Sequence, residues 1–156
     1  MEGEIIPMEE IKRLVRSILD IGFTISLGTV DGSGVWVCDL TYVSDSDLDI
    51  YWMSYTNVRH SEAVLKNPDV SGSITLSYNV GREVIGLQIG GVAEKLQGEP
   101  APEIVEKYAI KAGGVPPSKK QDGSIYPDAS WYRLKPKKIE LLYAPLYGFD
   151  KKVLEL

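Results

Sequence analysis

The chain has 156 residues, which fits one domain with its own hydrophobic core. Apolar residues make up 44% of it, the net charge is −5 and the pI is about 4.9, which argues against a nucleic-acid binder because such a protein needs a basic face. The single cysteine, Cys38, excludes an internal disulfide and fits a reducing cytoplasm.

No segment of the sequence looks like a targeting or membrane segment. Residues 1–7 (MEGEIIP) lack the basic start and the long apolar run of a signal peptide. The most apolar stretch, residues 84–93, is too short to cross a bilayer as a helix. We therefore expect a soluble cytoplasmic protein without a membrane partner, folded as one domain over residues 1–156.

The first predicted element is an amphipathic helix over residues 7–19. Its apolar residues recur at the spacing of one helix face. They are Ile11, Leu14, Val15, Ile18 and Leu19. Pro7 suits the first helical position, and Gly22 suits the exit from the helix.

Most of the remaining chain predicts strands, through alternating apolar residues or enrichment in β-branched and aromatic residues. In chain order these stretches are residues 23–30, 35–43, 48–54, 70–78, 83–96, 131–134, 139–143 and 153–156. Residues 31–34 (DGSG) and 79–81 (NVG) predict the turns of two hairpins. Short consecutive hairpins indicate an antiparallel barrel that is closed or nearly closed.

Glycines and prolines mark further features. Gly86, Gly90 and Gly91 lie inside the strand at 83–96, where glycine permits a bulge or sharp coiling. A second helix is expected from residue 101 or 102 to residue 112. The polar, proline-containing stretch 115–129 is the best candidate for a mobile flap.

A short helix is expected between the strand at 48–54 and Pro68, which ends it. Thr56 or Asn57 can cap its start by accepting a free backbone N–H. Its first turn carries Arg59 and His60, with no acid before Glu62.

Cations are unfavourable at the positive end of a helix, by roughly 0.3–1 kcal/mol each when exposed. A bound anion would reverse that sign, because the free N–H groups, Arg59 and His60 would then point at one negative group. The alternative is a solvated helix start at which Arg59 only pairs with a nearby acid. Both interpretations stay open from this segment alone.

The sequence lacks the residues that several kinds of metal and catalytic site require. One histidine and one cysteine are too few for a zinc cluster. Three acids at 45, 47 and 49 have the spacing of a calcium loop, but Ile50 and Thr56 stand where that loop needs glycine and glutamate. We therefore expect turn residues there and no metal site.

A Cys38–His60 nucleophilic pair is conceivable, but a small buried strand residue is the favoured role for Cys38. No G-x-S-x-G elbow, phosphate-loop lysine motif or G-x-G-x-x-G is present.

With these chemistries set aside, the sequence still indicates a candidate phosphate-binding site beside apolar and aromatic strands. Such a site would suit a ligand with a phosphate tail and a flat ring. Residues 38–40 (Cys38, Asp39 and Leu40) can line a ring edge, and Met53 and Ser54 can continue that wall toward the phosphate. Gln88 lies in an apolar strand, where its amide needs partners. It could bond a polar ring edge, its own backbone neighbourhood or a water.

Three large aromatic residues could stack on such a ring or lie in the core, and the core is the more common place for them. They are Trp52, Trp131 and Tyr132.

An ordered set of segments resembles the FMN-binding split-barrel superfamily, the pyridoxamine 5′-phosphate oxidase-related proteins. The segments are FTISLGTVDGSGVWVCDLTYV (23–43), LDIYWMSYTNVRHSEAVLKNPDV (48–70), GLQIGGVAEKL (86–96) and WYRLKPKKIELL (131–142). The S-x-x-x-x-R-H piece that leads into the short helix is the most specific. The resemblance implies a mainly β fold with flanking helices, a six-stranded antiparallel split barrel, and usually a homodimer with FMN in a groove between subunits.

The resemblance also implies a set of cofactor-binding residues. Arg59 and His60 match an Arg-Lys pair that holds the flavin phosphate, although histidine makes the second charge depend on pH. Strand contacts to the flavin are matched by Met53 and Ser54 and by Cys38, Asp39 and Leu40. Polar contacts farther along the chain are matched by Gln88 and by Lys151 or Lys152.

Two departures argue against the pyridoxine-phosphate reaction itself. The Arg-x-His substrate pair is absent, since residues 147–151 read YGFDK, and the strand at 35–43 lacks the family's basic residues. We therefore expect an FMN-dependent oxidoreductase that acts on another small molecule, without an assigned catalytic residue. The alternatives are a non-catalytic module that binds or stores flavin or haem, and a redox protein that uses a deazaflavin.

Overall fold

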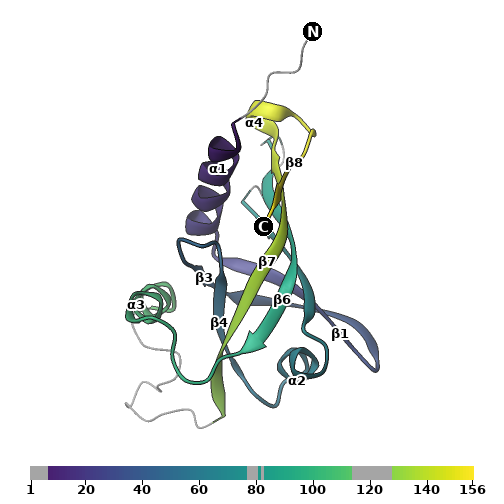
Figure 1. The fold of residues 1–156 in the computed structure, drawn as a ribbon, viewed down its shortest axis with the longest axis vertical. Helices are drawn as coiled ribbons and strands as arrows, with labels where there is room; N and C mark the ends of the chain where they lie inside the picture. The colour runs from purple at the N-terminus through teal and green to yellow at the C-terminus, as the bar shows by residue number, and fades with distance from the viewer. Residues whose placement is uncertain (1–6, 77–80, 82, 114–127) are drawn as a thin grey trace.

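The computed structural model describes residues 7–76, 81, 83–113 and 128–156. Its centre is a strongly curled antiparallel sheet with helices packed around it (Figure 1). The helices are α1 Met8–Ile21, α2 Arg59–Lys66, α3 Pro102–Lys111 and α4 Ala144–Tyr147. The strands are β1 Thr24–Asp31, β2 Gly34–Thr41, β3 Val43–Ser44, β4 Ile50–Tyr55, β5 Asp69–Thr75, β6 Ile85–Lys95, β7 Ala129–Tyr143 and β8 Lys152–Glu155.

The strands follow the order β2-β1-β5-β6-β7-β4-β3, and β8 pairs with β7. Every neighbouring pair is antiparallel. The expected mainly β, antiparallel fold with flanking helices is therefore confirmed, and the curled sheet is consistent with a split barrel. The expected number of six strands differs, because the short β3 separates from β2 and β8 adds a strand beside β7.

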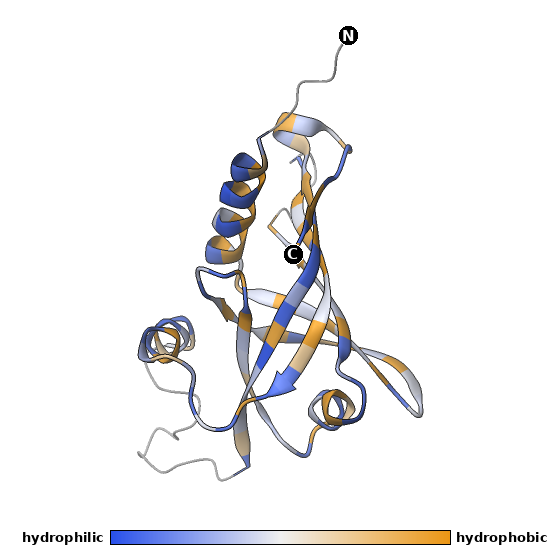
Figure 2. Ribbon diagram, in the orientation of Figure 1, coloured by the Kyte–Doolittle hydropathy of each residue, from blue (hydrophilic) through white to orange (hydrophobic). Residues whose placement is uncertain are grey.

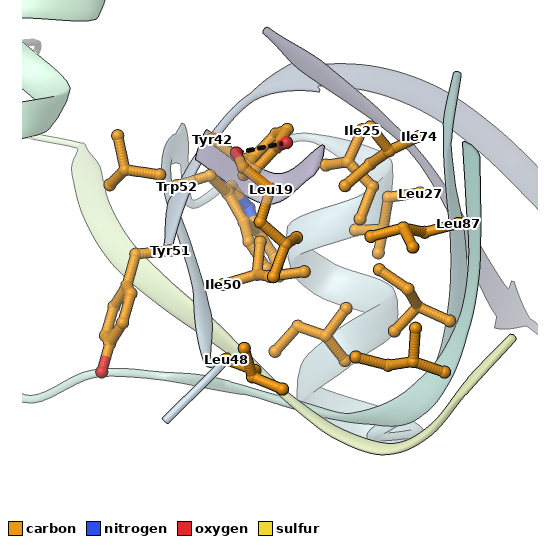
Figure 3. Packing of buried hydrophobic residues seen from close by; sticks show 14 of the residues in the cluster. Leu19, Ile25, Leu27, Tyr42, Leu48, Ile50, Tyr51, Trp52, Ile74 and Leu87 are labelled. Atoms are coloured by element: carbon orange, nitrogen blue, oxygen red, sulfur yellow. Dashed lines mark hydrogen bonds between the residues drawn. The ribbon is translucent and has the colours of Figure 1, made fainter. Parts of the chain in front are cut away.

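Helix α1 covers one side of the curled sheet with its apolar face. Figure 2 shows this face turned toward the strands and the charged face turned away. The hydroxyl of Tyr42 donates a hydrogen bond of 2.8 Å to the carbonyl of Leu19 near the end of the helix (Figure 3). The predicted helix is confirmed, with Pro7 one position earlier than expected, as its N-cap.

Gly22 ends α1 for a different reason from the expected one. Its backbone is extended, with φ −61°, so no left-handed conformation is needed. Instead the position lacks room, since a Cβ there would meet the Tyr42 hydroxyl and lie 2.9 Å from Cγ2 of Ile74.

The three aromatic residues that the sequence left between core and ligand are buried on opposite faces of the sheet, Trp52 and Tyr132 on one face and Trp131 on the face that meets α3. Trp52 and Tyr132 are fully buried and stacked, with ring centroids 5.8 Å apart. Trp131 is buried against Tyr108 of α3 in an edge-to-face contact of 5.2 Å. The core role is therefore confirmed for all three.

Strand β7 is continuous where two separate strands were predicted, and that prediction is wrong. Pro136 interrupts the sequence pattern because it has no N–H to give to the sheet. The sheet accommodates it through a bulge in β7, where Gly90 lies opposite Lys138 and Gly91 opposite Pro136, so that Lys137 is the extra residue. A Cβ on Gly91 would touch the carbonyl of Lys135 and lie 2.9 Å from the Cα of Pro136.

Some expectations lie outside the described residues. They are the flap at 115–129, of which only residues 128 and 129 are described, and most of the turn at 79–81. The predicted helix at 101–112 is confirmed as α3. Within the described ranges, no helix has both the length and the apolar content needed to cross a bilayer.

Candidate functional site

The start of α2 lacks a side-chain cap. Val58 is the N-cap residue, and no side chain in the described part of the chain accepts a hydrogen bond there. The expected cap by Thr56 or Asn57 is therefore wrong, and Thr56 instead donates its backbone N–H to the carbonyl of Asp128 over 2.7 Å. The N–H groups of the first turn and the positive end of the helix dipole remain suited to an anion.

Arg59 begins α2 and is held by the hairpin of β1 and β2. Its Nε and Nη2 atoms donate hydrogen bonds of 2.8 and 3.1 Å to the two carboxylate oxygens of Asp31. Its guanidinium lies 4.4 Å from the ring centroid of Trp36. Pairing with Asp31 is the alternative that the sequence left open, and it is present here.

The Arg59–Asp31 pair is only partly screened from solvent, with 34% of the Arg59 side chain exposed. The hydrogen bonds to Arg59 and to the Ser33 N–H hold the pKa of Asp31 below its ordinary value. A guanidinium has five N–H donors, so two bonds to Asp31 leave donors that an anion at the helix end could use.

His60 contacts the end of β4. Its Nε2 lies 2.8 Å from the hydroxyl of Ser54, which joins two of the predicted site residues. Burial lowers the pKa of His60, so its imidazole is neutral at pH 7 and adds a donor or acceptor rather than a charge.

The next helix residue, Ser61, was not predicted as a site residue. Its side chain is 1% exposed, and its hydroxyl has no hydrogen-bond partner among the described residues. Buried hydroxyl groups are normally satisfied, so this atom is a sign of a missing partner. A lone serine in a helix carries no sequence signal that could have indicated this.

The three predicted residues on β2 do not share one face. Cys38 and Leu40 lie opposite the buried Leu27 and Ile25 and pack against the core. Asp39 lies on the outer face and accepts a hydrogen bond of 2.5 Å from the hydroxyl of Ser26. Their side chains therefore do not line one surface together, although their backbone groups can still contact the ring of a bound ligand.

Burial raises the pKa of the Cys38 thiol, and Asp39 raises it further. The thiol is thus protonated at neutral pH, while a nucleophilic cysteine needs its thiolate. This argues for the packing role of Cys38.

The outer face of the sheet carries a groove of about 440 Å³ across β1, β2, β5, β6 and β7. The register brings small residues together there, including Ser26, Gly28, Ser71, Ser73 and Gly90. At the edge of the groove, Val37 is 59% exposed. A shallow apolar edge beside small residues suits a flat partner surface.

Gln88 lies in this groove, on the apolar strand β6 as expected, but its side chain is exposed, so its amide is not buried among apolar residues. Its Oε1 accepts a hydrogen bond of 2.5 Å from Lys151, which also donates to Glu140 over 3.3 Å. Lys152 instead pairs with Asp150 over 2.5 Å and lies 5.2 Å from the ring centroid of Tyr147.

Some of the predicted site residues form two separate groups, while Cys38, Asp39, Leu40 and Lys152 belong to neither. One lies at the start of α2, where Ser54 contacts His60 and Arg59 precedes it in the helix, whereas the side chain of Met53 lies on the other face of β4, beside Trp131. The other, Gln88 with Lys151, lies on the outer sheet face. Within the described residues no hydrogen bond or ion pair joins the two groups.

Comparison with known proteins adds a relative and several solved structures. No family model matches the chain. A UPF0306 protein of Photorhabdus laumondii is 32% identical over 76 residues. The match covers 48% of this chain and 53% of that relative, about half the length of each.

A candidate pyridoxamine 5′-phosphate oxidase of Listeria innocua superposes with a TM-score of 0.66 and 22% identity, covering 85% of this chain and 98% of that one. A haem-binding protein of Mycobacterium smegmatis gives 0.64 and 17%, covering 92% and 57%. An F420 reductase gives 0.61 and 19%, covering 80% and 94%. The chain has the split-barrel fold of pyridoxamine 5′-phosphate oxidase-like proteins. The resemblance seen in the sequence is therefore confirmed for the fold.

The split-barrel fold alone does not choose a ligand. One of these structures is named for haem, another for F420 and a third for pyridoxamine 5′-phosphate oxidation. The residues at the start of α2 must therefore carry any assignment.

Proposed function

We propose that this split barrel binds FMN, with the cofactor phosphate at the start of α2, and uses it to oxidise or reduce a small molecule. The observation that carries the proposal is the uncapped helix start, beside which Arg59 lies and the buried Ser61 hydroxyl lacks a partner. A doubly charged phosphate would accept hydrogen bonds from the first-turn N–H groups and from Arg59, whose only carboxylate partner among the described residues is Asp31.

The residues fit an FMN phosphate with one opposing feature. Arg59, the first-turn N–H groups and the neutral His60 can all donate, whereas Asp31 presents a negative charge to the same guanidinium. The pair is partly exposed, and exposed ion pairs contribute little to stability because solvent screens them. A phosphate could therefore share or displace Asp31 at low cost.

FMN would supply the electron chemistry, and the protein would hold and orient it. Met53 and Ser54 on β4, and the backbone of Cys38, Asp39 and Leu40 on β2, are the proposed contacts along the ring. We assign no catalytic base, because His60 is engaged with Ser54 beside the proposed phosphate.

The proposed assembly is a homodimer. Val30, Val35 and Val37 leave 41%, 73% and 59% of their surface exposed on the β1–β2 hairpin. Figure 2 shows this hairpin projecting from the sheet with apolar residues near its tip. A second copy packed on this face would cover the valines and the adjacent groove that contains Gln88.

A second candidate is a module that binds flavin or haem without turnover. The solved structure named as a haem-binding protein has this fold, and His60, the one histidine of the sequence, is neutral and half-buried. The structure named F420 reductase favours, in the same way, a deazaflavin with redox activity.

Mass spectrometry of the ligand released from protein purified from cells separates flavin, deazaflavin and haem. If flavin is found, NADH or NADPH is then added without oxygen, followed by a candidate acceptor. Bleaching of the flavin and its recovery with the acceptor support the oxidoreductase. A bound flavin that neither nicotinamide reduces supports the non-catalytic module.

A further inference from the structure

A second pocket lies away from the start of α2, between the end of α1, strand β3 and helix α3. We call it the α1–α3 pocket. Its volume is about 330 Å³, at the small end of ligand-binding cavities. Leu19 and Val43 form a buried apolar floor, and Ile110, which is 69% exposed, forms an apolar edge.

Two lysines of α3 are fixed at this pocket by backbone carbonyls. The ammonium group of Lys111 donates hydrogen bonds of 2.7 and 2.6 Å to the carbonyls of Gly22 and Tyr42, and it lies 4.4 Å from the Tyr42 ring centroid. Lys107 donates to the carbonyl of Ser44 over 3.1 Å. An ammonium group has three donors, so each lysine keeps at least one N–H for a ligand.

Neither lysine has a counterion in direct contact. Across the described ranges, no carboxylate lies within 4.0 Å of Lys107 or Lys111. Asp20 also lines the pocket and acts on Lys111 from a greater distance. Two cations and one acid leave a net positive pocket with an apolar floor.

We propose that the α1–α3 pocket binds a small monocarboxylate with an apolar body. The carboxylate would accept hydrogen bonds from Lys107 and Lys111, and the apolar body would cover Leu19, Val43 and Ile110. The volume favours a free small molecule over a folded partner. This site shares no residue with the proposed FMN site and stands independently of it.

The test is a titration of the full chain with hexanoate, followed by ¹⁵N–¹H NMR. We expect saturable shifts at Val43, Ser44, Ile110 and Lys111, and binding at least about tenfold weaker for hexan-1-ol and for inorganic phosphate. Equal binding of hexanoate and hexan-1-ol, or shifts spread over all surface lysines, would overturn the proposal. That comparison needs no variant.

Variants of the two lysines test their role in binding directly. Lys107→Met and Lys111→Met keep most of the apolar stem and remove the charge, so each should weaken hexanoate binding by roughly tenfold. Lys12→Met, on the exposed face of α1, is the matched control and should bind hexanoate like the wild type. Unchanged binding in both α3 variants, with the wild-type circular dichroism spectrum, would show that these lysines only fasten α3.

Discussion

The carboxylate of Asp31 accepts two hydrogen bonds from the guanidinium of Arg59. These bonds connect the tip of the β1–β2 hairpin to the first residue of α2. The proposed phosphate would lie at the same helix end. The pair therefore links two properties of the protein: Asp31 holds Arg59 in position, and it also competes with an anionic ligand for the same donors.

Asp31→Asn should raise the affinity for FMN. Removing one like charge near the phosphate should strengthen FMN binding, by up to roughly fivefold because the pair is partly exposed and screened by solvent. Quenching of flavin fluorescence during titration measures it. Asp69→Asn, an exposed acid at the start of β5, is the control and should change nothing. Weaker binding by Asp31→Asn would mean that Asp31 chiefly positions Arg59.

His60 should make stability depend on pH. Burial lowers its pKa in the folded protein, so the unfolded chain binds this proton more readily. The contribution of His60 is thus complete above its ordinary pKa of 6.5 and is lost as the pH falls through the folded value. Urea unfolding at about pH 7.5 and about pH 5.5 should show a larger loss in wild type than in His60→Gln. Identical losses would argue against a buried neutral imidazole.

Val37→Glu should convert the proposed dimer to a monomer without unfolding it. Val37 is 59% exposed, so the change costs the folded subunit little, but it would bury a charge in the interface. Sedimentation or solution scattering gives the mass. Leu65→Glu, at a 62% exposed position of α2, is the control and should remain dimeric. A monomeric wild-type mass with bound flavin would contradict the dimer.

Gly91→Ala should lower the free energy of unfolding by about 1–3 kcal/mol, since overpacking against rigid backbone cannot be relieved by a side-chain movement. The Cβ would meet the backbone of Lys135 and Pro136 across the bulge. At Gly32 nothing lies within 4 Å, so Gly32→Ala should change the same free energy by less than about 0.5 kcal/mol. Equal effects in urea unfolding would show that the bulge tolerates a side chain.

Local patterns predicted much of this fold. The spacing of apolar residues in α1, the DGSG turn and the alternation in β1 are each set by nearby residues, and each prediction agrees with the structure. The continuity of β7 through Pro136 was missed because it depends on Gly91 in another strand. The separation of Cys38 and Asp39 onto opposite faces follows from strand alternation, but their partners depend on the register with β1.

The candidate site was predictable only in part. The unusual charge order at Arg59 and His60 was visible in the sequence, as was the place of Ser54 just before the helix. The contacts of Arg59 with Asp31 and Trp36 were not, because both partners come from a hairpin more than twenty residues upstream. The unsatisfied hydroxyl of Ser61 follows from burial, which one polar residue cannot indicate.

The dissociation constant of FMN for wild type and Arg59→Ala tests the central claim most directly. Arg13→Ala is a matched control, because Arg13 also pairs with an acid, Glu10, but lies on α1. We predict that wild type and Arg13→Ala bind FMN equally and that Arg59→Ala binds it roughly tenfold to hundredfold more weakly, as expected for lost charged hydrogen bonds. Wild-type protein that refuses FMN, or an Arg59→Ala variant that binds it like wild type, would contradict a phosphate site at the start of α2.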